Sequence, residues 1–236
     1  MLVEKEKTLG GQLPLAATPP HKQEVAALTS FLSGELRRLD VAVVLGREAD
    51  ASVVEQVRPD AVVIATGSTA LTPPIAGLDT LPWLTGREVL AGKTVTGKKV
   101  AVVGGGMVGC EIAEFLAGKG KEVTVLEMLP ELALDAEFRV RKNLLQRLKD
   151  MGVATRTATK VLAFAPGEIR LAGPDGESLL TGMDAVVLCL GSKKDDALAL
   201  ALLDSGKRDV FPVGDCFKPA SVMDAMHHAF RMAYHI

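Results

Sequence analysis

Residues 99–109 read KVAVVGGGMVG, and this stretch decides the fold. The apolar run Val100–Val103 predicts a buried strand, and the three glycines that follow it predict a tight turn. Apolar residues at helical spacing then predict a helix over Met107–Gly118. A strand, a glycine turn and a helix in this order form the first part of a βαβ unit.

The alternation of strands and helices continues toward the C-terminus. The expected elements are strands at Glu122–Glu127, Val153–Thr157, Val161–Phe164, Ile169–Leu171 and Ala185–Leu190, and a helix at Asp135–Met151. Because such an order builds a parallel sheet covered on both faces, we predict an α/β, Rossmann-like fold of three layers.

The flanking regions are less regular. Residues 12–22 are expected to be a loop, and Leu81–Gly97 a linker with one short helix. The other expected elements are helices at Gln23–Leu39, Asp195–Leu203 and from Ser221 onward, and strands at Leu2–Val3, Val41–Leu45, Asp60–Ala65 and Val210–Val213.

The composition is that of an ordinary globular protein. Of 236 residues, 48% are hydrophobic and 24% charged, and the net charge is −2, so nothing points to nucleic acid or an anionic membrane as a partner. No run of apolar residues is long enough to cross a bilayer and no signal peptide is visible, which favours the cytoplasm. The three cysteines are scattered, so we expect no disulfide framework, metal site or redox dithiol.

Each glycine of the turn has a separate physical role in a dinucleotide-binding fingerprint. Gly104 allows the tight turn, Gly106 lets the backbone approach a pyrophosphate, and Gly109 allows close packing of helix and strand. The pyrophosphate would bind the free N–H groups of the helix that begins with Met107 and Val108. The strand before the turn and the helix after it supply the structural context that the motif requires.

Glu127 ends the next strand and lies 23 residues after Gly104. An acidic side chain in this place reaches the ribose hydroxyls of the adenosine. A 2′-phosphate would face this carboxylate, and residues 128–130 contain no Arg or Lys that could neutralise it. The sequence therefore predicts NAD(H) rather than NADP(H).

Glu4 ends the short strand Leu2–Val3 in the same way that Glu127 ends its strand. It is either the ribose-binding acid of a second nucleotide site or an exposed acid in a terminal segment. In the first case, the glycine turn of that second site would lie before residue 1, and we expect the chain to be a fragment.

Several short motifs, taken in order, resemble the pyridine nucleotide–disulfide oxidoreductase superfamily, in which an NAD domain is inserted into an FAD domain. The closest resemblance is to the C-terminal half of the 2,4-dienoyl-CoA reductase, enoate reductase and trimethylamine dehydrogenase group. The motifs are Glu4, the turn with Gly11 and Gln12, the crossover Ala65, Thr66 and Gly67, the strand end at Gly191, and the final pair Gly214 and Asp215.

The resemblance implies a domain organisation. Residues 1–75 and 207–236 would form a partial FAD-binding domain without its first βα unit, and residues 97–206 the NAD-binding domain. FAD would contact the motifs of the partial domain, with Asp215 near its ribityl or phosphate region. FMN and a 4Fe–4S cluster are expected only in an N-terminal half outside this chain.

The implied activity is an NADH-dependent flavin oxidoreductase. Hydride would pass from NADH to flavin, and electrons would go on to the N-terminal half, where an enoate or enoyl-CoA-type substrate is reduced. We find no catalytic side chain in this chain and expect it to be inactive alone. Its partners would be NADH and the N-terminal half, and a homo-oligomer is left open. Two alternatives remain: an NADH oxidase or ferredoxin-reductase-like flavoenzyme, and a non-catalytic ADP- or NAD-binding module.

Overall fold

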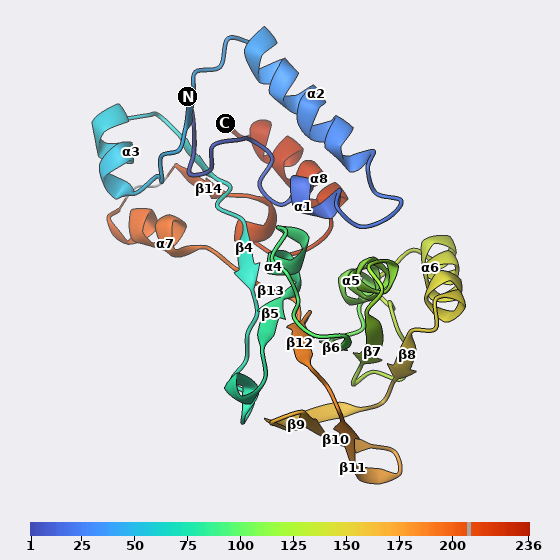
Figure 1. The fold of residues 1–236 in the computed structure, drawn as a ribbon. Coiled ribbons are helices and arrows are strands. Elements are labelled where there is room, and N and C mark those ends of the chain that lie inside the picture. Colours follow the sequence, from blue (N-terminus) through green and yellow to red (C-terminus); the bar gives the residue numbers. More distant parts are fainter. Residues whose placement is uncertain (207–208) are drawn as a thin grey trace. The chain divides into compact units, whose positions relative to one another are not determined.

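The computed structural model of the chain describes residues 1–206 and 209–236, which form two compact units (Figure 1). One unit comprises Met1–Pro14, Ala26–Thr69 and Ser192–Ile236, and the other Leu15–Val25 and Ala70–Gly191. The expected domain boundary at residue 207 lies outside the described residues.

The unit with Ala70–Gly191 is built around a parallel sheet of five strands. Their order is β5-β12-β6-β7-β8, and each neighbouring pair is parallel. The strands are β5 (Trp83–Thr85), β6 (Lys99–Val103), β7 (Glu122–Leu126), β8 (Ala154–Arg156) and β12 (Ala185–Leu188). The sheet and its Rossmann-like βαβ connections agree with the predicted fold class.

The strands of this sheet bury both faces. In β6, Val100 and Val102 belong to a core shared with the helices α4 (Gly86–Leu90), α5 (Met107–Gly118) and α6 (Phe138–Asp150). Successive side chains point to opposite faces, so the alternating residue Ala101 belongs to a second core. This alternation explains why β6 appears in the sequence as a continuous apolar run.

A second sheet covers the other face and forms the third layer. It is antiparallel, with the order β11-β10-β9, and consists of β9 (Lys160–Ala165), β10 (Glu168–Gly173) and β11 (Gly176–Thr181). Ile169 and Leu171 of β10 are fully buried against the parallel sheet. The sequence pattern predicted two of these strands but not β11.

Two expectations for this unit were wrong. The supposed linker Leu81–Gly97 contains β5, which is the edge strand of the parallel sheet, as well as the short helix α4. The helix expected from Asp135 begins only at Phe138, because the Glu137 side chain caps it by accepting hydrogen bonds from the N–H groups of the first turn.

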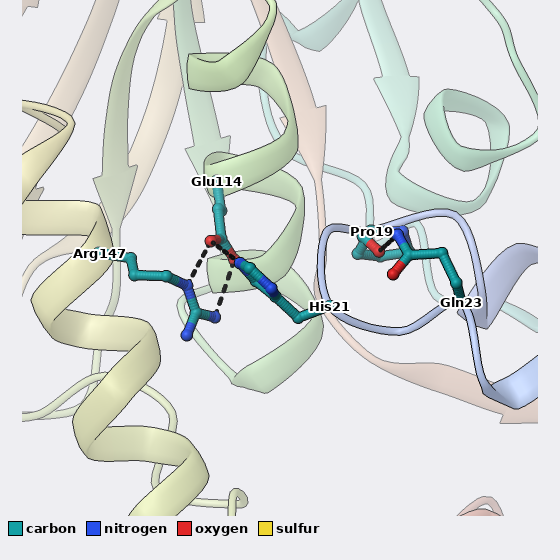
Figure 2. A network of polar contacts seen from close by, with 5 residues as sticks. All are labelled: Pro19, His21, Gln23, Glu114 and Arg147. Carbon is teal, nitrogen blue, oxygen red and sulfur yellow. Dashed lines mark hydrogen bonds and ion pairs between the residues drawn. The ribbon is translucent and has the colours of Figure 1, made fainter.

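Ion pairs hold the helix α5 in place. Glu111 and Glu114 of this helix are buried, and Lys22 Nζ lies 2.8 Å from Glu111 Oε1. Figure 2 shows Glu114 between Arg147 of α6 and His21 of the segment Leu15–Val25. Buried carboxylates need such partners, so Glu111 has a structural role in this helix.

The other unit contains three pairs of short strands. β1 (Leu2–Glu4) pairs in parallel with β2 (Val43–Leu45), β3 (Val62–Ile64) with β14 (Val210–Pro212), and β4 (Ser68–Ala70) pairs with β13 (Ser192–Lys194). Its helices are α2 (Val25–Arg38), α3 (Ala51–Val57), α7 (Ala197–Asp204) and α8 (Val222–Ala233); α1 (Leu13–Ala16) lies at the limit between the units, in the segment expected to be a loop. As predicted, Ser221 caps α8.

Candidate nucleotide-binding site

The turn between β6 and α5 requires glycine at two positions. Gly104 has a φ of +100°, and a Cβ atom there would lie 2.2 Å from the carbonyl oxygen of Cys189. A Cβ atom on Gly109 would lie 1.9 Å from the carbonyl oxygen of Gly104. Both distances are far below a van der Waals contact, so only glycine lets α5 begin this close to the sheet.

Gly106 differs from these two glycines because the atoms nearest to its Cβ position belong to a side chain and not to the backbone. It is the N-cap of α5, with φ −64° and ψ 179°, which any residue can adopt. The nearest neighbour of a Cβ atom on Gly106 would be the carboxylate of Asp135, at 3.4 Å. The absence of a side chain therefore leaves the backbone open to approach from outside, beside the first turn of α5, where the N–H of Met107 donates to the Asp135 carboxylate.

Glu127 directly follows β7, and its carboxylate binds the backbone on both sides. One oxygen accepts the N–H of Gly105 at 2.5 Å, and the other accepts the N–H of Leu129 at 2.7 Å. The side chain is buried. Each carboxylate oxygen has a further lone pair, so the same group can also accept from a hydroxyl. The sequence alone did not predict that Glu127 also fixes the glycine turn.

A cavity of about 320 Å³ lies beside the turn. It brings Gly106 and Glu127 together, as the sequence predicted, and adds a segment that the sequence did not assign to a site. The lining residues are Gly105, Gly106, Glu127, Leu129, Glu131, Ala133, Leu134 and Asp135. A helix N-terminus, a glycine at its N-cap and a carboxylate acceptor are a set of groups that fits an adenosine diphosphate group.

Gly191 is not part of this cavity. It has a φ of +91°, and its carbonyl oxygen accepts the N–H of Leu71 at 3.0 Å. In the structure, Gly191 therefore adopts a turn conformation and forms a backbone hydrogen bond. Its contact with a nucleotide stays a prediction.

In the other unit, the structure brings three motifs together through side chains. Gln12 Nε2 donates to Ser68 Oγ at 3.2 Å and to Asp215 Oδ2 at 3.1 Å. Ser68 Oγ donates to the same Asp215 oxygen at 2.7 Å. The turn of Gly11, the crossover of Ala65–Gly67 and the Gly214–Asp215 pair thus share one polar network. Ser68 was missed, although it directly follows the crossover motif.

The remaining predicted residues of this unit lie in backbone turns or at the end of a strand. Gly11, Gly67 and Gly214 all have positive φ values, which glycine adopts most readily. Thr66 Oγ1 donates to the carbonyl oxygen of Asp195. Glu4 ends β1, as expected, and its carboxylate accepts the N–H of Glu6 at 2.9 Å.

Residues 1–206 and 209–236 contain no cluster of three His, Cys, Asp or Glu side chains that could hold a metal ion. No described helix has the length and apolar character needed to span a membrane.

Similarity to known proteins was found in both sequence and structure. The family described as pyridine nucleotide-disulphide oxidoreductase matches residues 38–233. An NADH oxidase of Thermoanaerobacter brockii is 36% identical over 245 aligned positions, which cover 100% of this chain and 37% of the relative. A bilirubin reductase of Mediterraneibacter gnavus is 37% identical and covers 94% of this chain and 34% of its own length.

Among solved structures, a 2-naphthoyl-CoA reductase superposes with a TM-score of 0.92 at 27% identity, over 99% of this chain and 36% of that one. The histamine dehydrogenase of Rhizobium sp. 4-9 has the same fold, with a TM-score of 0.89 at 22% identity over 99% of this chain and 37% of that one. The chain thus spans about a third of the length of the relatives that it matches. With the fold, the fingerprint and this match over most of its length, the chain belongs to the pyridine nucleotide-disulphide oxidoreductase family.

Proposed function

We propose that this chain is the nucleotide-binding portion of a flavin-dependent NADH oxidoreductase. The observation that carries the proposal is the cavity in which the open backbone of Gly106 and the carboxylate of Glu127 meet at the start of α5. When bound, NADH supplies a hydride and a flavin accepts it. The side chains described here bind and orient NADH and the flavin, and none of them is needed as an acid or base.

Within this proposal, the diphosphate binds the first-turn amides of Met107 and Val108, and Gly106 leaves room for it. Glu127 accepts from the ribose hydroxyls with the lone pairs that its two backbone bonds leave free. Glu131 and Asp135 also line the cavity, so a 2′-phosphate would meet three carboxylates. This charge favours NADH over NADPH.

The FAD contacts are proposed for the other unit. Gln12, Ser68 and Asp215 are already joined by hydrogen bonds, which gives the flavin cofactor a pre-formed polar surface. Glu4, Gly11, Ala65–Gly67 and Gly214 are the proposed backbone and ribose contacts.

A reductive activity of the whole protein is supported by the names of similar proteins. They include a bilirubin reductase, a cinnamate reductase of Clostridium sporogenes and a 2-naphthoyl-CoA reductase. We propose that electrons pass from FAD to an N-terminal half with FMN and a 4Fe–4S cluster, where an enoate or enoyl-CoA-type substrate is reduced. The chain spans about a third of these relatives, so this half is proposed to be a further part of the protein.

The proposal is tested by titrating the purified chain with NADH, NADPH and ADP in a calorimeter. We expect NADH to bind more tightly than NADPH, and Gly106→Val to weaken NADH binding by about tenfold or more, because its side chain enters the diphosphate position. Gly34→Val is the matched control, since a Cβ atom at Gly34 has only the end of the Arg37 side chain within 4 Å. Unchanged NADH affinity in a folded Gly106→Val variant would refute the proposal.

The role of Glu127 is tested separately. Glu127→Gln is expected to raise the NADPH affinity relative to that for NADH, with the exposed Glu168→Gln as control. Equal affinities for ADP and NADH would instead favour a non-catalytic nucleotide-binding module. The flavin part of the proposal predicts that FAD binds to the purified chain, measured by the same calorimetric titration.

A further inference from the structure

The carboxylate of Asp135 lies at the N-terminus of α5. Its Oδ1 atom accepts the N–H of Met107 at 2.7 Å, although 28 residues separate the two along the chain. Gly106 is the N-cap and has no side chain that could bind the first turn. Asp135 therefore caps this helix in place of an N-cap side chain. It binds an amide that a phosphate would also bind.

The segment that carries Asp135 is attached to the glycine turn. The N–H of Ala133 donates to the carbonyl oxygen of Gly105 at 2.7 Å, and Leu132 and Ala133 are buried. Arg141 holds the same segment from α6, with Nε donating to the carbonyl oxygen of Leu132 at 2.8 Å. These bonds keep the backbone at residue 135 next to α5, while the Asp135 side chain itself is exposed to solvent.

The surroundings of Asp135 are negatively charged. Glu127, Glu131 and Asp135 line one cavity, and the Arg141 guanidinium pairs with Glu131. Burial and, after it, the charges of Asp135 and Glu127 together raise the pKa of the nearby Cys110 thiol to about 12. A diphosphate that enters this cavity meets repulsion from these carboxylates as well as attraction from the helix.

We propose that Asp135 competes with the diphosphate of the nucleotide for the Met107 amide and thereby sets the affinity of the site. This inference rests on the proposed function of the cavity. Binding then requires the Asp135 side chain to turn away from Met107 while the backbone of its segment stays in place. The N-terminus of α5 is then capped by Asp135 without nucleotide and by the diphosphate when nucleotide is bound. The competition lowers the affinity for the nucleotide.

The test compares Asp135→Asn and Asp135→Ala with the unmodified chain by calorimetric titration with NADH and with inorganic pyrophosphate. Loss of the competing charge is expected to tighten NADH binding about fivefold, the effect of one charge at a helix terminus. Asp175→Asn is the control: it removes the same charge from an exposed turn between β10 and β11 and should leave NADH affinity unchanged.

A second measurement follows the Met107 amide directly in a ¹⁵N-labelled chain. Its resonance should move on Asp135→Ala substitution without nucleotide, and it should move in the unmodified chain when NADH is added. This inference would be overturned if the unmodified chain binds NADH clearly and both Asp135 variants bind it no more tightly than the unmodified chain does. The proposed function would still stand in that case. If neither the unmodified chain nor the variants bind NADH, the proposed function fails as well. Asp135→Asn keeps the shape of the side chain and serves if Asp135→Ala does not fold.

Discussion

The guanidinium of Arg147 on α6 donates to both carboxylate oxygens of Glu114 on α5, with Nη2 3.1 Å from Oε2 (Figure 2). The Glu114 side chain is only 4% exposed, whereas Arg147 is 35% exposed. The hydrogen bond to Glu114 raises the pKa of Arg147. His21 approaches the same carboxylate at 3.8 Å from a largely exposed position. Arg147 is therefore the main partner of a buried charge on the helix that begins at the candidate site.

Removal of Arg147 should destabilise the fold. Arg147→Met removes the main partner of the buried Glu114 carboxylate and leaves His21 at 3.8 Å from it, so we expect a loss of about 3 kcal/mol in the free energy of unfolding. Arg139→Met is the control, because Arg139 lies exposed on the same helix. Urea unfolding measures both. Equal stability of the two variants would show that the ion pair contributes nothing.

The close approach of α5 to the sheet predicts a strong effect at Gly109. In Gly109→Ala, the new methyl group would lie 1.9 Å from the carbonyl oxygen of Gly104, so the helix must shift. We expect a loss of about 3 kcal/mol in the free energy of unfolding. Gly118→Ala, at the end of the same helix, brings its methyl group only to 3.7 Å from Met151 and should be neutral or stabilising. A neutral Gly109→Ala would contradict the described packing.

The N-terminus of α4 predicts a dependence of stability on pH. Lys93 Nζ and the N–H of Thr85 both donate to Glu88, and these bonds lower the pKa of Glu88 from 4.5 to about 2. A lowered pKa means that the stabilisation is complete above pH 4.5 and is lost as the pH falls toward 2. Glu88→Gln should therefore lower the free energy of unfolding by about 1 kcal/mol at neutral pH, because solvent screening limits the effect. The loss should become smaller as the pH falls.

Unfolding curves measured between pH 7 and pH 3 test this expectation. The exposed Glu55→Gln in α3 is the matched control and should show no such convergence with the unmodified chain. The assigned role of the charge would be contradicted if the free energies of unfolding of Glu88→Gln and the unmodified chain differed by the same amount across this pH range.

The thiols of Cys110, which is buried, and Cys189, which is partly buried, should resist modification. Burial raises the pKa values of Cys110 and Cys189 to about 12, so almost no thiolate forms at pH 8. We expect neither cysteine to react with a thiol reagent in the folded chain within minutes, and both to react at once in urea. Peptide mass spectrometry assigns the modified residues. Rapid labelling of Cys110 in the folded chain would show that the turn beneath α5 opens readily.

Local physical rules were enough to predict the centre of the fold from the sequence. The helix Met107–Gly118 was predicted with the bounds that the structure shows, because a glycine turn marks its start and an apolar face continues to its end. The cap of α8 at Ser221 and the position of Glu127 after β7 were also correct. In each case, the deciding interactions lie within a few residues of one another, or in a motif of fixed spacing.

Long-range pairing decided what the sequence did not show. β5 is only three residues long and is a strand because it pairs with β12, about a hundred residues further along the chain, so its own residues carry no periodic signal. The antiparallel third layer depends in the same way on contacts with the opposite face of the parallel sheet.

The candidate site shows the same division. The sequence by itself determined the glycine turn, the helix that follows it and the acid on the neighbouring strand, because backbone sterics require glycine at Gly104 and Gly109 wherever such a turn occurs. Only the tertiary structure decided that Asp135 lies on the Met107 amide rather than in a helix. That contact forms because α6 starts late, at Phe138, and the segment before it folds back onto the turn. Such a contact between distant residues has no local signature.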